Sequence, residues 1–111
     1  MDYRGPDCSG LTALAHRLAK HLAEAKAAEG RNLVFSPLSV YAAVALVAEG
    51  ARGATQRELL EALGAESRVD LAALVRDIAD RALADRSPSG GPVVAFASGV
   101  WHDAAWALEP A

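Results

Sequence analysis

The chain has 111 residues, of which 52% are hydrophobic and 23% charged, a composition typical of one globular domain and not of a disordered segment. Its 11 basic and 14 acidic residues give a net charge of −3, which provides no attraction for nucleic acid or an anionic membrane surface. One cysteine, Cys8, excludes an internal disulfide, and the first ten residues lack the basic and apolar regions of a secretory signal peptide, so a cytoplasmic location is predicted.

Residues 1–10 are predicted to be a flexible N-terminus, and an amphipathic helix is predicted over residues 11–29. Its apolar residues recur every three or four positions, and polar residues occupy the opposite side. Gly30 follows where a left-handed residue commonly ends a helix. The apolar positions of this helix are Leu11, Leu14, Leu18, Leu22 and Ala25.

Residues 32–35 are predicted to be a short extended segment, and a second helix is predicted to begin at Ser36 and run to about Glu49. A serine N-cap followed by proline at the first helical position is a strong start signal, since proline lacks only a donor that would be unpaired there. The apolar run 40–48 is too short to cross a membrane, which takes ~20 residues. Because this helix has almost no polar face, we expect it to be buried within a larger protein.

Two further helices are predicted. Thr55 and Glu58 are spaced as a capping box, which predicts a third helix that ends near Leu63. A fourth helix is predicted over residues 70–84, followed by a loop rich in glycine, serine and proline at 85–92.

Residues 93–102 are predicted to be a long strand, because the segment is nearly continuous in β-branched, aromatic and small residues. A strand of this kind needs neighbours on both edges, and residues 32–35 are the only other candidate. We therefore expect the chain to be an incomplete part of a larger fold.

Ser36 and Ser39 invite interpretation as nucleophiles, with His16, His21 or His102 as the base. A catalytic serine needs a base within hydrogen-bonding reach, and the sequence has no G-x-S-x-G motif. Helix capping accounts for Ser36 without chemistry. We therefore expect the protein not to be an enzyme.

Metal and cofactor sites are not predicted. The three histidines and one cysteine have no spacing typical of metal ligands. The glycine-containing stretch 50–55 lacks the Gly-Lys-Ser/Thr ending of a phosphate-binding loop.

The stretch NLVFSPLSVYAAVALVAEGARGATQRELLEALG, residues 32–64, closely resembles the helix B to helix C segment of the serpins, the serine-protease-inhibitor superfamily. FASGVWHDAAWALEP, residues 96–110, is similar to the second strand of the serpin main sheet. The Gly-Val-Trp-x-Asp wording within it resembles the plant branch most, although the Ala- and Arg-rich composition would also suit an actinobacterial origin.

This resemblance implies an α+β fold that is mostly helical, with helices A to D, one long strand and one short strand. It also implies that the protein is a serine-type endopeptidase inhibitor whose partner is a serine or cysteine protease. In serpins, cleavage of the reactive loop lets it insert into the main sheet as a new strand, and the acylated protease is dragged along and distorted. The residues that match the shutter, where that sheet parts, are Asn32, Phe35, Ser36, Pro37 and Ser39.

Some serpins bind glycosaminoglycans through a basic helix D. Here the arginines of the fourth helix alternate with aspartates, so no heparin patch is predicted. The residues concerned are Arg76, Arg81 and Arg86 against Asp70, Asp77, Asp80 and Asp85.

The family places its reactive loop near the C-terminus, far beyond the segments matched here. We therefore expect residues 11–111 to be a truncated N-terminal part of a serpin domain that does not inhibit by itself. Two alternatives stay open: an interaction fragment that pairs through its exposed strand, and the product of an incomplete or decayed gene. The family would also allow an extracellular location.

Overall fold

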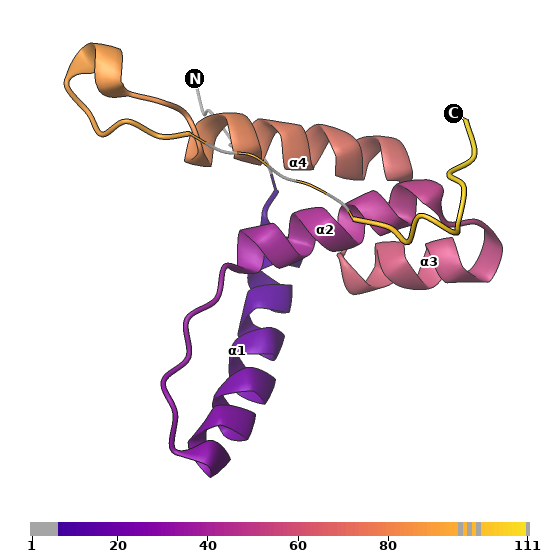
Figure 1. The fold of residues 1–111 in the computed structure, drawn as a ribbon, viewed down its shortest axis with the longest axis horizontal. Helices are drawn as coiled ribbons and strands as arrows, with labels where there is room; N and C mark the ends of the chain where they lie inside the picture. The colour runs from indigo at the N-terminus through magenta and orange to yellow at the C-terminus, as the bar shows by residue number, and fades with distance from the viewer. Residues whose placement is uncertain (1–6, 96, 98, 100, 111) are drawn as a thin grey trace.

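The computed structural model describes residues 7–95, 97, 99 and 101–110, and this part of the chain is mostly helical, as predicted. Figure 1 shows α2 in the centre, with α1, α3 and α4 each packed against it. The C-terminal half of α1 projects away from the other helices. The elements are α1 (Ser9–Glu29), α2 (Pro37–Gly50), α3 (Gly53–Ala62), α4 (Arg68–Ala82) and the short 3-10 helix η1 (Ser87–Ser89).

Local sequence signals explain where two of the helices begin. Ser36 is the N-cap of α2 and Pro37 is its first residue, which confirms the predicted start. Ser67 caps α4, and its Oγ accepts a hydrogen bond from the Asp70 N–H at 3.1 Å. That helix therefore begins two residues before the predicted position.

Gly30 ends α1 as predicted. Its φ of 65° lies in the left-handed region, and its N–H donates to the Ala27 carbonyl at 3.1 Å. At the other end α1 begins at Ser9, two residues before the predicted Leu11. Residues 1–6 of the predicted flexible N-terminus lie outside the described residues.

The predicted capping box is wrong. The N-cap of α3 is Arg52, which makes no side-chain capping bond, and Thr55 and Glu58 lie inside the helix. The helix starts at Gly53, before Thr55, and the φ of Gly53 is 60°, in the left-handed region that glycine adopts readily. Gln56 then fixes the first turn, because its Nε2 donates to two carbonyl oxygens at the end of α2.

The core lies where α2 meets the other helices. Its fully buried side chains are supplied by α2, by α4 and by Leu63, which directly follows α3. Half-buried leucines of α1 and α3 pack around them. The buried residues of this cluster are Tyr41, Ala45, Ala48, Leu63 and Leu71, and Ile78 of α4 is buried as well.

The helices cover α2 only in part. Leu46 is 56% exposed and Val47 is 61% exposed, although both lie in the middle of the most apolar helix of the chain. The neighbouring helices therefore leave part of the apolar surface of α2 open to solvent.

The prediction of two strands is not confirmed. The described residues of 32–35 and 93–102 form no strand, and residues 96, 98 and 100 lie outside the described residues. A strand is stable only when its backbone N–H and C=O groups pair with a neighbour, and neither segment has one in the described part of the chain. The apolar, β-branched composition predicted a conformation that needs a partner.

Candidate functional site

The candidate site is the N-terminal end of α2, where the sequence placed its shutter residues. Ser36 holds an extended backbone with φ −109° and ψ 107°, and its Oγ accepts a hydrogen bond from the Ser39 N–H at 3.2 Å. Its carbonyl oxygen accepts from the Val40 N–H, also at 3.2 Å. Ser36 therefore closes the first turn of the helix twice, once with its side chain and once with its backbone.

A small cavity of about 130 Å³ lies beside this turn. Its wall combines both serines with apolar side chains from α2 and α4, so the serines form the polar edge of an otherwise apolar hollow. Both serines are exposed to solvent. The residues that line the cavity are Ser36, Leu38, Ser39, Ala42, Val75, Ala79 and Leu83.

Asn32 and Phe35 precede α2 in the connection from α1, and neither lines this cavity. Asn32 is exposed, whereas Phe35 and Pro37 are half-buried. The five predicted residues are thus neighbours in sequence, but the structure brings only Ser36 and Ser39 together at the cavity.

The histidines lie apart from the serines. His16 and His21 are exposed residues of α1. The Nδ1 atom of His102 lies 3.0 Å from the Asp103 carbonyl oxygen and 3.1 Å from that of Trp106. Among the described residues, no hydrogen bond joins a histidine to Ser36 or Ser39, so the geometry assembles no nucleophile and base.

A larger apolar groove of about 380 Å³ is lined by residues of α2 and α4. Its floor includes Ala42, Ala45 and Ala72, whose small side chains leave the space open. Sequence reasoning missed this groove, although the alternation of alanine with larger residues on both helices was the available signal. The remaining lining residues are Leu46, Glu49, Arg68, Leu71, Val75, Arg76, Ala79 and Asp80.

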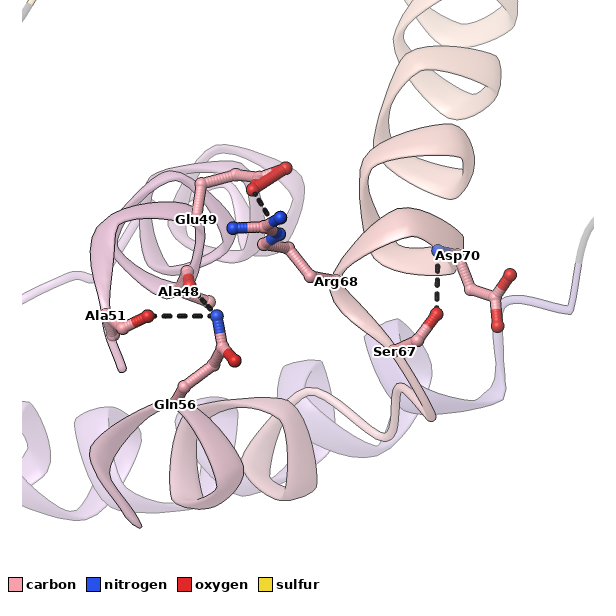
Figure 2. Close-up of polar contacts among 7 residues, drawn as sticks. All are labelled: Ala48, Glu49, Ala51, Gln56, Ser67, Arg68 and Asp70. Carbon is pink, nitrogen blue, oxygen red and sulfur yellow. Dashed lines mark hydrogen bonds and ion pairs between the residues drawn. The ribbon is translucent and has the colours of Figure 1, made fainter. Parts of the chain in front are cut away.

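Polar contacts link α3 and α4 to the C-terminal end of α2, as Figure 2 shows. The Arg68 Nε lies 3.2 Å from the Glu49 Oε2, which links the start of α4 to the end of α2. The Gln56 Nε2 donates to the carbonyl oxygens of Ala48, at 3.1 Å, and Ala51, at 2.9 Å. Arg68 and Gln56 thus connect the first turns of α4 and α3 to the C-terminal end of α2.

The carboxyl groups with perturbed pKa values lie in turns and not at the cavity. Hydrogen bonds from Ser87, first from its backbone N–H and then from its hydroxyl, lower the pKa of Asp85. The pKa of Asp7 is lowered in the same way by Ser9. Burial raises the pKa of Tyr41, and electrostatic interactions with Cys8 and Asp7 add to this effect.

The described residues were also compared with what a metal site, a membrane span and a basic binding surface require. Within the described ranges, no three His, Cys, Asp or Glu side chains are placed to hold a metal ion. None of the helices that the structure describes has the length and hydrophobicity needed to cross a membrane. On α4, the Arg81 Nε lies 3.1 Å from the Asp77 Oδ1, so this arginine is paired with an acid one turn earlier in the helix.

The chain is similar to one family of known proteins. The model of the family described as Serpin (serine protease inhibitor) matches residues 9–111. The chain is 55% identical to Serpin-Z2A of Oryza sativa subsp. japonica over 111 residues, which are all of this chain and 26% of that protein. It is 57% identical to Serpin-Z2B of the same species over 105 residues, 95% of this chain and 26% of that protein.

A wheat protein is also similar. Serpin-Z1C of Triticum aestivum is 41% identical over 99 residues, 89% of this chain and 25% of that protein. No solved structure matches the chain. The chain spans about a quarter of the length of these curated relatives, all of which are plant proteins, as the resemblance to the plant branch predicted. Because the family match extends over nearly all of its residues, this chain belongs to the serpin family.

Proposed function

We propose that these 111 residues supply the helical support of a serpin that inhibits a serine protease, with the Ser36 end of α2 in the position of the shutter. The observation that carries this proposal is the family match over residues 9–111. Protease inhibition is what the family description names. The partner is accordingly a protease, of the serine or the cysteine class.

The geometry around α2 supports the proposal. The helix enters through an exposed serine cap beside an apolar cavity, and its side chains Leu46 and Val47 lack cover. Uncovered apolar surface on a central helix is stabilised when a further layer packs over it. In the serpin arrangement, the main sheet is that layer, and the strand predicted at 93–102 is part of it.

We further propose that the 111 residues do not inhibit by themselves, because the reactive loop of the family belongs to a later part of the fold. The test is incubation of the purified chain with trypsin-like and chymotrypsin-like proteases, followed by denaturing electrophoresis. We expect no SDS-resistant complex, while an inhibitory full-length serpin forms one in parallel. A stable covalent complex with the 111-residue chain would refute this part of the proposal.

A chimera tests the structural role directly. Replacing the matching N-terminal quarter of an inhibitory plant serpin with this chain should preserve the SDS-resistant complex of the parent. Ser36→Leu in the chimera should then divert the reaction towards plain cleavage, since the shutter would no longer part normally. A chimera that folds but never traps protease would argue against the proposed support role.

A second function is favoured by the exposed C-terminal segment. Val93 is an exposed apolar residue, and Trp101 is 89% exposed, so the segment could pair with the sheet of another chain by strand addition. Under this alternative the chain is an interaction fragment, and it should bind a partner sheet through residues 93–102. A chain from a decayed gene should instead fail to melt cooperatively.

A further inference from the structure

The loop between α4 and the C-terminal segment contains a closed hydrogen-bonded turn centred on Asp85. The Oδ1 atom of Asp85 accepts from the Ser87 N–H at 3.0 Å and from the Val94 N–H at 3.3 Å. Its Oδ2 atom accepts from the Ser87 Oγ at 3.0 Å. One carboxylate thus links the start of the loop, at Ser87, to its end, at Val94. We refer to these three contacts as the Asp85 clasp.

The loop is placed where another protein can reach it. Figure 1 shows η1 at the tip of a loop that extends beyond the end of α4, away from the other helices. Arg86, Pro88 and Ser89 are exposed, and the turn is only three residues long, so opening it disrupts little structure. Residues 86–88 read Arg-Ser-Pro, the serine-before-proline pair that proline-directed protein kinases phosphorylate.

We propose that Ser87 is a phosphorylation site for a proline-directed protein kinase, and that its modification opens the Asp85 clasp. In the reaction the Ser87 Oγ attacks the γ-phosphorus of a nucleoside triphosphate. The Oγ–P bond forms, the bond from that phosphorus to the bridging oxygen breaks, the nucleoside diphosphate leaves, and the hydroxyl proton passes to the kinase's base. The proposal is independent of protease inhibition.

The consequence follows from charge. Phosphorylation removes the hydroxyl donor that Asp85 binds at 3.0 Å and puts a charge of about −2 beside the same carboxylate. Two anions at that separation repel, and the exposed Arg86, the preceding residue in the chain, offers the phosphate a cationic partner. Asp85 is therefore pushed away from the turn, and the Val94 N–H loses its acceptor. Val94 is thereby released from Asp85.

The experiment treats the 111-residue chain with a proline-directed kinase and ATP and locates phosphate by mass spectrometry. We expect one phosphoryl group on Ser87, none there in Ser87→Ala or Pro88→Ala, and unchanged modification in Ser89→Ala. The last is a matched control, because the Ser89 Oγ donates to the Arg86 carbonyl and not to Asp85. Failure to modify Ser87 in the intact chain would overturn the assignment.

The release is read from amide hydrogen exchange at Val94. We expect roughly ten- to hundredfold faster exchange after phosphorylation, the change that loss of one hydrogen bond to a charged group predicts. Asp85→Ala should raise the rate by a similar factor without kinase. A phosphorylated Ser87 with unchanged Val94 exchange would show that the clasp stays closed and refute the switch.

Discussion

The hydroxyl of Tyr41 donates a hydrogen bond of 2.9 Å to the carbonyl oxygen of Leu63, and both residues are completely buried. This contact joins the first turns of α2 to the end of α3 across 22 residues of sequence. The neighbouring Ala62 carbonyl accepts from the Arg17 guanidinium of α1 at 2.8 Å. The C-terminal end of α3, whose carbonyls have no partner within the helix, is thus satisfied by side chains of α1 and α2.

Tyr41→Phe should lower the free energy of unfolding by about 1–3 kcal/mol, because the Leu63 carbonyl would stay buried without its donor. The measurement is the urea midpoint followed by circular dichroism. Val34→Ala serves as the control, since Val34 is exposed and its substitution should change little. Equal midpoints for wild type and Tyr41→Phe would contradict the buried contact.

Alkaline pH should weaken the fold through the same residue. Burial raises the folded-state pKa of Tyr41 above its ordinary value of 10.0, so the folded protein holds this proton more tightly than the unfolded chain. The stabilisation is therefore complete below the unfolded pKa and is lost as pH rises through the higher folded pKa. Urea midpoints compared between about pH 8 and about pH 11 should fall in wild type and fall less in Tyr41→Phe.

Gly10 and Gly50 should respond with opposite signs to alanine. A Cβ on Gly10 would meet the Leu63 carbonyl oxygen, whereas nothing lies within 4 Å of the corresponding position on Gly50. Alanine in a helix normally stabilises by roughly 0.5–1 kcal/mol relative to glycine, which is the upper limit expected for Gly50→Ala at the end of α2. Gly10→Ala should instead destabilise by about 1–3 kcal/mol, because α1 would have to move away from α3. Thermal melts of both variants test this, and a stabilised Gly10→Ala would exclude the close approach.

The two serines of the candidate site should also differ. Ser36→Ala should cost about 0.5–2 kcal/mol, because it removes the acceptor for the Ser39 N–H. Ser39→Ala should be nearly neutral, since the bond between the two residues uses only the backbone N–H of Ser39. Denaturation of the single and double variants measures both effects. If Ser39→Ala costs as much as Ser36→Ala, the capping geometry does not account for the pair.

Helix-capping patterns, which involve residues close in sequence, explain which helix boundaries could be predicted. Ser36 followed by Pro37 decides the start of α2 within a few residues, so that prediction is correct. Thr55 and Glu58 also have the spacing of a capping pattern, but α3 begins earlier, at Gly53. The Gln56 side chain in its first turn binds the end of α2. Contacts across the turn between α2 and α3 accompany that outcome, and the capping-box pattern of Thr55 and Glu58 does not contain them.

The candidate site also has one part that the sequence could predict and one part that it could not. The cap of α2 is local and was predictable, whereas the approach of Val75 and Ala79 to Ser36 depends on how α4 packs against α2. The long strand failed for a related reason. Its composition indicates burial on both faces, and burial of that kind needs neighbouring strands, which the described residues do not provide.

The fluorescence of the two tryptophans measures whether the C-terminal segment is covered by a partner. Trp101 is 89% exposed and Trp106 is 75% exposed, and they are the two tryptophans of the chain. The isolated chain should therefore show fluorescence of water-exposed indole, readily quenched by acrylamide. Packing against a partner sheet should shift the emission to the blue and protect it from quencher, because apolar surface would leave water. A protected, blue-shifted emission that persists as the 111-residue chain is diluted to a monomer would show that the helices cover this segment themselves, and that no partner is needed.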